Sequence, residues 1–451
     1  MSVLQGQLLN KYNLSGPRYT SYPTALQLGD IDPEVLVSKC REATAGSLSL
    51  YLHIPFCHSL CYYCGCNKVI TRQVHKAEVY MGYLMREISE QSQAFTDKKV
   101  TQIHFGGGTP TYLSDEQFTR LMAHIRTAFR VSGKAEISVE VDPRQMALPR
   151  LQHLYELGFN RLSIGVQDFN PAVQQAVNRV QDESHIFALV TLARELGYAS
   201  VSLDLIYGLP HQTPQSFAET IDKVLQIRPD RLSVFNYAHM PDKFAAQRRI
   251  DDSVLPDSAQ RTAIFGTASE LLTKQGYLCI GMDHFALRDD ELAIAQEEGC
   301  LHRNFQGYTT QGECDLLGLG VSAISQINGL IVQNEKDLKT YYRAIDDAGS
   351  ATAKGYELSD DDKVRAEVIK QLICHFRLSF QSIEQSFNIR FGDYFAEEMQ
   401  RLKQMVADGL LDVSDKEIKV SQAGRALIRA ICMQFDRYLP LSRQKAFSRI
   451  I

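Results

Sequence analysis

Residues 51–68 have the sequence YLHIPFCHSLCYYCGCNK, in which four cysteines follow a predicted β-strand. Cys57, Cys61 and Cys64 have the spacing C-x3-C-x2-C, and Cys66 lies just beyond them. Three thiolates can bind three irons of a [4Fe–4S] cluster, which leaves the fourth iron without a protein ligand. A small molecule can coordinate that open iron, so the segment predicts a cluster with one reactive position.

Two other interpretations of these cysteines stay open at this point. A structural zinc site typically has two ligand pairs separated by a finger-length spacer, whereas these four cysteines are crowded together. Buried, inert cysteines are the second alternative. A disulfide framework is typical of small secreted chains, but this chain has 451 residues and its other cysteines are scattered. The crowding therefore favours metal binding.

A glycine run follows the next predicted strand, in the sequence HFGGGTPTYL of residues 104–113. Glycines let the backbone approach a ligand closely and expose its N–H groups at the end of a strand. Taken alone, such a run is equally typical of a tight turn. Its position one strand–helix unit after the cysteines favours a ligand site.

The region from about residue 48 to 285 alternates predicted strands with amphipathic helices such as 115–129 and 214–227. The predicted strands are 48–54, 101–105, 136–141, 160–166, 200–207 and 231–237, with a weaker seventh at 277–283. This alternation predicts an α/β fold with a parallel sheet, and specifically a partial (β/α) barrel of about six units.

Polar residues end several of these strands, where the loops of a barrel build active sites. They are Glu140, Asp142, Gln167, Asp204 and Asn236. Any one of them is explained equally well as the N-cap of the following helix. Their common position at the mouth of the predicted barrel favours a functional site.

The pattern changes after about residue 350. Segments 361–378, 395–409 and 422–439 have the periodicity of amphipathic helices, and 410–421 predicts a small hairpin. We therefore predict three parts: an N-terminal arm or flap (1–45), a barrel with its extension (46–345) and a mostly helical, winged-helix-like domain (346–451). The charges of the last part are mixed rather than basic, which favours a cover or scaffold over DNA binding.

The composition is that of an ordinary globular protein, with 44% hydrophobic and 22% charged residues. The formal charge of 48 − 53 = −5 argues against a general nucleic-acid binder. No apolar run reaches the ~18 residues of a membrane span, and the N-terminal residues lack a secretory signal pattern. We expect a cytoplasmic protein.

The cysteine motif followed by GGGTP resembles the radical SAM (S-adenosylmethionine) superfamily. Further motifs resemble its family of oxygen-independent coproporphyrinogen III oxidases. They are PRYTSYPTA (17–25), EVDPR (140–144), FNRLSIGVQDFN (159–170), DLIYGLPHQTPQSF (204–217), RLSVFNYAHMP (231–241), GMDHFA (281–286) and LHRNFQGYTTQG (301–312). The resemblance extends over most of the chain.

The resemblance implies an oxidoreductase of haem (porphyrin) biosynthesis that works without oxygen. The cluster would cleave SAM to give a 5′-deoxyadenosyl radical. Two propionates of coproporphyrinogen III would then be oxidatively decarboxylated to vinyls, giving protoporphyrinogen IX. Two SAM per turnover, an electron donor for the cluster, an electron acceptor and a monomeric enzyme are also implied.

The resemblance also implies roles for individual residues. Cys57, Cys61 and Cys64 would bind the cluster, while Tyr51 and Cys66 would serve catalysis. The first SAM would contact Tyr51, Gly107, Glu140 and Ile324. A second SAM would contact Tyr63, Gly108, Thr109, Gln167, Arg179, Asp204 and Ala238. Candidates for binding the substrate propionates are Arg18, His53, His284, Arg303 and Gln306, although each histidine is equally typical of a core residue.

Two rival functions have discriminating features. Haem-binding chaperones of the same superfamily share the barrel and the cluster motif but typically lack the fourth cysteine, here Cys66, and the PRYTSYP arm. This sequence has both, which favours the oxidase. A structural iron–sulfur or zinc protein would not need the GGGTP segment.

We predict that replacing Cys57, Cys61 or Cys64 by Ala abolishes cluster assembly and activity, because only two thiolates then remain. Cys66→Ser is the control, since it should still assemble the cluster but not complete turnover. Iron counting together with an activity assay measures both effects. Four irons and full turnover in any of the three alanine variants would contradict the ligand assignment.

Overall fold

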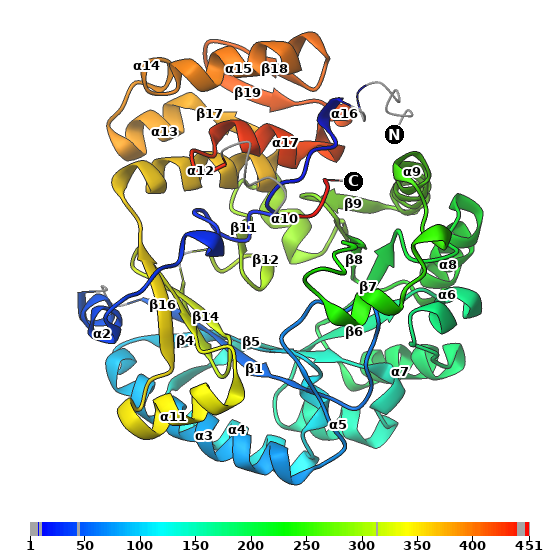
Figure 1. Ribbon diagram of the computed structural model, residues 1–451, viewed down its shortest axis with the longest axis vertical. Coiled ribbons are helices and arrows are strands. Elements are labelled where there is room, and N and C mark those ends of the chain that lie inside the picture. Colours follow the sequence, from blue (N-terminus) through cyan, green and yellow to red (C-terminus); the bar gives the residue numbers. More distant parts are fainter. Residues whose placement is uncertain (1–7, 9–10, 43–45, 313, 440–446, 451) are drawn as a thin grey trace. The chain divides into compact units, whose positions relative to one another are not determined.

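The computed structural model describes residues 8, 11–42, 46–312, 314–439 and 447–450 (Figure 1). They form two compact units. The first, called the cysteine unit, contains the described residues of 27–204 and 313–358, and the second unit contains those of 1–26, 205–312 and 359–451. No helix within the described ranges has the length and apolarity to cross a membrane. Each unit combines segments of more than one predicted part, and the three-part division itself stays a prediction.

The cysteine unit is built on a mainly parallel sheet in which the predicted strands form, whereas its four strands between residues 315 and 357 were not predicted. Strands β1 (Ser47–Ile54), β4 (Lys99–Gly107), β5 (Arg130–Val141) and β6 (Arg161–Gln167) are parallel neighbours in this order. On its other edge β1 pairs in parallel with β13 (Asp315–Leu319). An antiparallel extension follows, made of β14 (Ile324–Ile327), β15 (Leu330–Asn334) and β16 (Thr352–Glu357).

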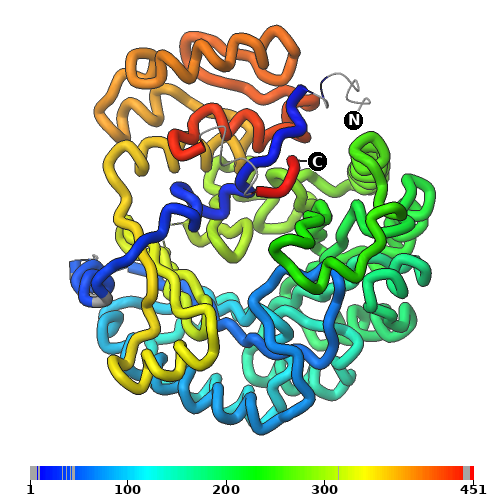
Figure 2. The backbone as a smooth tube through the Cα atoms, viewed as in Figure 1, coloured from blue at the N-terminus to red at the C-terminus, as the bar shows by residue number. Residues whose placement is uncertain are grey.

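Helices cover one face of the sheet of the cysteine unit, and alternate residues of its strands point toward them (Figure 1). Leu48, Leu50, Leu52 and Ile54 of β1 are all fully buried. The helices of this unit include α3 (His75–Ser92), α4 (Asp115–Ala128), α5 (Leu148–Glu156), α7 (Glu183–Leu196) and α11 (Leu338–Ala348). Figure 2 shows that the late segment 314–358, in yellow, returns beside the blue and cyan strands of the same unit.

The second unit contains α8 (Pro214–Ile227), β8 (Arg231–Asn236) and α9 (Ser258–Lys274). The strand predicted over 277–283 is shorter than expected. Only Tyr277–Ile280 forms a strand, β9, and it pairs antiparallel with β10 (His284–Leu287), which pairs antiparallel with β8. Gly281 has a φ of +59°, so the chain turns there instead of continuing as another strand–helix unit.

The C-terminal region is helical as predicted, with two corrections. The helix expected over 361–378 is α12 (Asp360–His375). It ends earlier than expected because Phe376 has a φ of +56°, and Arg377–Ser379 then forms β17. Strand β17 adds to the predicted hairpin of β18 (Leu411–Val413) and β19 (Glu417–Val420). The helix expected over 395–409 is α15 (Ala396–Ala407).

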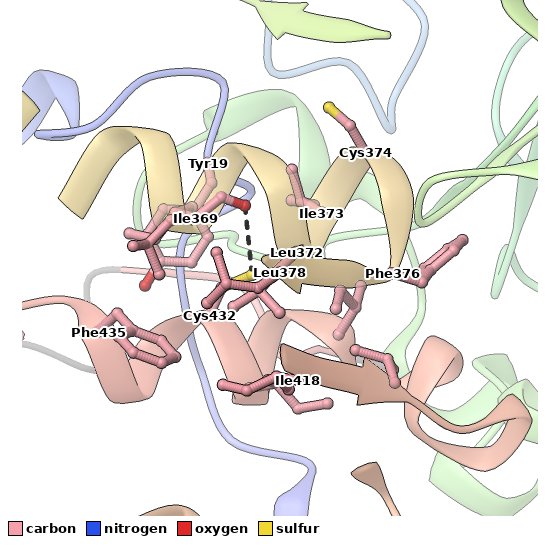
Figure 3. Packing of buried hydrophobic residues seen from close by; sticks show 14 of the residues in the cluster. Tyr19, Ile369, Leu372, Ile373, Cys374, Phe376, Leu378, Ile418, Cys432 and Phe435 are labelled. Atoms are coloured by element: carbon pink, nitrogen blue, oxygen red, sulfur yellow. Dashed lines mark hydrogen bonds between the residues drawn. The ribbon is translucent and has the colours of Figure 1, made fainter. Parts of the chain in front are cut away.

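The helix expected over 422–439 is broken into short pieces. They are α16 (Gln422–Ala426), α17 (Ile428–Cys432) and a 3-10 turn at Met433–Phe435. Leu427, at the break, has a φ of −110°, outside the helical range. This shape lets α17 pack against α12, where the Cys432 thiol faces the Ile369 carbonyl oxygen at 3.9 Å (Figure 3).

The predicted arm is divided between the units: its described residues up to Leu26 pack into the core of the second unit, whereas Pro33–Glu42 forms helix α2 of the cysteine unit. Tyr19 and Tyr22 are each only 4% exposed, and the Tyr19 hydroxyl donates a hydrogen bond to Asp436 at 3.0 Å. Arg18 forms an ion pair with Asp283. The aromatic residues of the PRYTSYP motif therefore anchor it to the second unit.

A buried carboxylate of the cysteine unit forms hydrogen bonds with the antiparallel extension of the sheet. Glu87 of α3 accepts hydrogen bonds from the Gly320 N–H (2.7 Å), the Tyr341 hydroxyl (2.7 Å) and the Asn334 amide (2.6 Å). Burial raises the pKa of Glu87 to about 7, although these three donors oppose the increase. The carboxyl thus connects α3 with the loop after β13, β15 and α11.

This environment predicts a pH-dependent stability. Since the folded-state pKa of Glu87 is raised, its contribution is complete below about pH 4.5 and is lost as the pH rises through about 7. The change amounts to about 3 kcal/mol at ~1.4 kcal/mol per pKa unit. Glu87→Gln should abolish this pH dependence of the free energy of unfolding, as measured by urea denaturation, while the exposed Glu90→Gln should retain it. An identical pH profile in Glu87→Gln and the unmodified protein would contradict the assignment.

Candidate cofactor site

A cavity of about 160 Å³ in the cysteine unit is lined mainly by polar residues of β4, β5, β6 and β7 (Ser200–Tyr207) and of the loops that follow β1, β4, β5 and β6. It brings together twelve of the predicted site residues: Cys57, Cys61, Tyr63, Cys64, Cys66, Gly107, Gly108, Thr109, Glu140, Gln167, Arg179 and Asp204. Parallel strands place their following loops at one edge of the sheet, which explains how residues so distant in sequence converge.

The cysteine loop is closed at its base by backbone pairing. The two-residue strands β2 (Phe56–Cys57) and β3 (Val69–Ile70) are parallel, and the Val69 N–H donates to the Pro55 carbonyl oxygen at 2.7 Å. Inside the loop the Lys68 ammonium donates to the Cys64 carbonyl oxygen at 2.9 Å. These contacts join the two ends of the loop and connect its interior residues.

Hydrogen-bond donors face two of the cysteine sulfurs. The Thr109 hydroxyl lies 3.3 Å from Cys57 Sγ, and guanidinium nitrogens of Arg144 and Arg179 each lie 3.4 Å from Cys61 Sγ. Such donors stabilise thiolate charge and tune an iron–sulfur cluster. The donor set therefore fits a cluster held by these cysteines.

The thiols differ in acidity. Burial raises the pKa of Cys57 to about 12, although the Thr109 hydroxyl opposes this shift. A hydrogen bond with the Cys66 thiol lowers the pKa of Cys64 to about 6, and the same contact raises that of Cys66. Among the residues that the structure describes, no three His, Cys, Asp or Glu side chains converge on a single ion. In a cluster each thiolate binds its own iron, so the cysteines need not converge in that way.

The glycine run is required by close contacts on three sides. A Cβ atom at Gly106 would lie 2.9 Å from the Tyr51 ring, and one at Gly107 would lie 2.6 Å from the His53 ring. A Cβ atom at Gly108 would lie 2.6 Å from the Pro55 carbonyl oxygen. Gly107 also has a φ of +117°, and its N–H donates to Glu140 at 3.1 Å. These contacts, with Gly107 and Gly108 lining the cavity, favour a ligand site over a plain turn.

Two arginines and one carboxylate form an ion-pair group in the wall of the cavity. Asp142 accepts from Arg144 at 2.6 Å and faces Arg179 at 3.4 Å. Burial opposes ionisation of Asp142, but the two guanidinium charges outweigh it and hold its pKa below the usual range. Arg179 is only 6% exposed, and its Nε atom has no hydrogen-bond partner within the described ranges. This orphaned donor is suited to a polar ligand.

The remaining predicted residues lie as follows. The prediction that Asp204 lies at the end of a strand is wrong, because it occupies the fifth position of β7 (Ser200–Tyr207). Its carboxylate accepts a hydrogen bond from the Ser163 hydroxyl at 2.8 Å. Tyr51 stacks on His104, with ring centroids 5.9 Å apart. Ile324 begins β14, and Ala238 lines a separate cavity in the second unit. Their contacts with SAM stay predictions.

Sequence reasoning missed Arg144, Lys68 and Ser163, which also line the cavity. Arg144 belongs to the quoted EVDPR segment, so its place beside a strand-end carboxylate was a usable signal. Lys68 and Ser163 carried no distinguishing pattern.

The five substrate candidates separate into two groups. His53 lies in the cysteine unit, and its ring nitrogens face Tyr51 and the Asn67 carbonyl oxygen. The other four lie in the second unit, three of them in one aromatic cluster. In it Arg18 and His284 contact the Phe235 ring, while His284 and Arg303 contact the Tyr308 ring. Two nitrogens of Arg303 and the Gln306 amide nitrogen lack hydrogen-bond partners in the part of the chain that the structure describes.

The chain has extensive similarity to known proteins. Residues 51–224 match the radical SAM superfamily, and residues 358–427 match the HemN C-terminal domain. The oxygen-independent coproporphyrinogen III oxidase of Escherichia coli (strain K12) is 55% identical over 446 residues, 98% of each chain. That of Pseudomonas aeruginosa is 50% identical over 451 residues, again 98% of each chain. A solved structure of coproporphyrinogen III oxidase (HemN) from Escherichia coli, described as a radical SAM enzyme, has a TM-score of 0.92 and 53% identity, covering 95% of this chain and 100% of the other.

The contact between Thr109 and Cys57 predicts an effect on cluster potential. Reduction places more negative charge on the sulfurs, so a donor to sulfur stabilises the reduced form. Thr109→Val should lower the midpoint potential by about 40 mV, the equivalent of ~1 kcal/mol for one electron. Thr111→Val is the matched control, because Thr111 is also buried and its hydroxyl has no partner among the described residues. Equal potentials for both variants in a redox titration followed by electron paramagnetic resonance would show that the contact has no such role.

Proposed function

The chain belongs to the oxygen-independent coproporphyrinogen III oxidases of the radical SAM superfamily, and we infer from this membership how its cavity works. The protein is an oxidoreductase of porphyrin biosynthesis that decarboxylates two propionates of coproporphyrinogen III to vinyls. Its family carries a [4Fe–4S] cluster and uses SAM. The observation that carries the assignment is the convergence of Cys57, Cys61 and Cys64 with the Gly107–Thr109 segment in one cavity.

The residues of this cavity have different roles in binding the cluster and SAM. When bound, the cluster supplies the electron that cleaves SAM and thereby the radical that removes hydrogen from a propionate β-carbon. Cys57, Cys61 and Cys64 hold the cluster, and the donors to their sulfurs balance its negative charge. Gly107 brings the backbone close to the SAM bound there, and Glu140 offers a carboxylate for its ammonium or hydroxyl groups. Tyr51, Cys66 and Ile324 complete the proposed site of the first SAM and of catalysis.

A second SAM in the same cavity is proposed on the basis of a second polar group of residues. Gln167, Arg179 and Asp204 line the cavity together with Tyr63, Gly108 and Thr109. The unpartnered Nε of Arg179 supports binding of a carboxylate, such as that of a methionine moiety. Ala238, from the second unit, belongs to this proposal by family resemblance.

The aromatic cluster of the second unit is proposed to bind substrate propionates. Arg303 keeps two unpartnered nitrogens while its guanidinium stacks 4.5 Å from the centroid of the Tyr308 ring. A guanidinium fixed in this way can bind a carboxylate through parallel hydrogen bonds. Arg18 is already paired with Asp283, so Arg303 and Gln306 are the better supported of the candidates.

Several further properties are part of the proposal. We propose two SAM per turnover, an external one-electron donor for the cluster and an electron acceptor for each decarboxylation. A monomer in the cytoplasm is proposed from the sequence and from family resemblance. The ordered PRYTSYP arm supports the oxidase over the haem-binding alternative, because that alternative typically lacks it.

The test of the function is an anaerobic assay of the reconstituted protein with SAM, a chemical reductant, a one-electron acceptor and coproporphyrinogen III. We expect CO₂, 5′-deoxyadenosine and protoporphyrinogen IX to form together. Haem titration is the companion measurement. Tight haem binding without any CO₂ release would overturn the assignment in favour of a chaperone.

The second SAM site predicts a selective defect in Asp204→Ala. Loss of one charge-assisted contact, worth ~1.5–3 kcal/mol, should weaken the second site by about one to two orders of magnitude. The cluster spectrum and its perturbation by the first SAM should be unchanged, while divinyl product should decrease. Equilibrium dialysis with labelled SAM measures the stoichiometry, and a melting curve checks the fold. Two SAM bound at unchanged affinity in a destabilised protein would refute the role.

A further inference from the structure

A second cavity of the cysteine unit, with a volume of about 490 Å³, is strongly basic. Lys68, Lys76, Lys336 and Lys339 line it together with His75, and Asp337 is its single carboxylate among the described lining residues. The whole chain has a formal charge of −5, so this concentration of positive charge is a local departure. We call this surface the lysine face.

The charges of the lysine face are available to a partner. Lys76, Lys336 and Lys339 are exposed, and within the described ranges none of these three lysines forms an ion pair. Asp337 is engaged as the N-cap of α11, where it accepts from the Lys339 and Thr340 N–H groups at 2.9 and 3.2 Å. Helices α3 and α11 both begin at this cavity, and their N-terminal dipoles add to the positive potential.

Apolar side chains are exposed beside these charges. Val79 lines the cavity and is 50% exposed. Val74, which directly precedes α3, is 59% exposed, and Ile70, which follows the lining residue Val69, is 40% exposed. Apolar contacts surrounded by charges of one sign are typical of a docking surface for a protein of opposite charge. A small free anion would not need these exposed valines.

The lysine face lies on the same loop as the cluster ligands. Lys68 lines both the lysine face and the cofactor cavity, and its ammonium is bonded to the Cys64 carbonyl oxygen. Asn67, also a lining residue, directly follows Cys66. A protein seated on the lysine face would therefore contact the loop that carries the cluster.

We propose that the lysine face docks an acidic, low-potential one-electron carrier protein that reduces the cluster. The proposal rests on the proposed function, in which each SAM cleavage consumes one electron from outside the chain. One electron passes from the reduced carrier to the oxidised cluster, so that the carrier is oxidised and the cluster reduced. No atom or proton is exchanged between them.

The test compares two double variants with equal changes in net charge. Lys76→Glu/Lys339→Glu reverses two charges of the lysine face, in the first turns of α3 and α11, where glutamate is compatible with the helix dipole. Lys99→Glu/Lys134→Glu is the matched control, because both lysines are exposed and lie near the beginnings of β4 and β5, at the end of the sheet opposite the cysteine loop. The probe is a purified plant-type [2Fe–2S] ferredoxin of acidic net charge, a low-potential one-electron carrier.

Two readouts are measured at low and high salt: ferredoxin binding by titration calorimetry, and the rate of cluster reduction by reduced ferredoxin in stopped flow. For the unmodified protein and the control, both should weaken as salt increases. The lysine-face variant should bind at least about tenfold more weakly and be reduced correspondingly more slowly. Reduction by dithionite, and turnover with dithionite, should be unchanged in all three proteins.

Three outcomes overturn the proposal. Binding and reduction rates in the lysine-face variant that equal those of the control would show that the carrier docks elsewhere. Absence of ferredoxin binding to the unmodified protein would show that the lysine face does not dock such a carrier. If inorganic phosphate displaces ferredoxin at constant ionic strength, the cavity is a site for small anions. If the unmodified protein shows no turnover with dithionite, the proposed function is refuted instead. The assay thus distinguishes failure of the docking proposal from failure of the proposed function.

Discussion

The parallel pairing of β1 with β4 is the constraint on which the rest of the site depends. Its register places Ile54 opposite Gly107, and the Gly108 N–H continues the pairing to the Ile54 carbonyl oxygen at 2.8 Å. The cysteine loop and the glycine loop therefore leave the sheet at the same edge. Side chains at the glycine positions would force the two loops apart, because the distances to His53 and Pro55 leave no room for a Cβ atom. The cavity exists because this pairing is so close.

Charge balance is the second feature that unites the site. A cluster with three thiolates concentrates negative charge, and the cysteine unit supplies Arg144, Arg179 and Lys68 around it. Asp142 between the two arginines keeps them oriented, while its own pKa is lowered by them. On the outer side of the loop, Lys76, Lys336 and Lys339 extend the positive surface toward solvent. The same loop thus has an inner side suited to cofactors and an outer side suited to an acidic partner.

Much of the fold was predictable because its patterns are local. Strand β7 and helix α8 have the predicted bounds, and the cysteine spacing alone was enough to predict a ligand set. The antiparallel direction of β9 was not predictable, since a short apolar segment has the same periodicity in either direction. The break at Leu427 and the strand at Arg377–Ser379 depend on tertiary packing that no local pattern encodes. No local pattern indicates the burial of Arg179, and the fold shows that it lies in a buried site beside Asp142 and Cys61.

The central claim is that three cysteines hold a cluster whose remaining iron binds SAM in this cavity. Mössbauer spectroscopy of the anaerobic protein reconstituted with ⁵⁷Fe tests it most directly, by comparing spectra before and after SAM is added. SAM should change the isomer shift of one iron in the cluster and leave the other three nearly unaltered. A spectrum in which SAM shifts no individual iron, at concentrations where SAM binding is saturated, would contradict it.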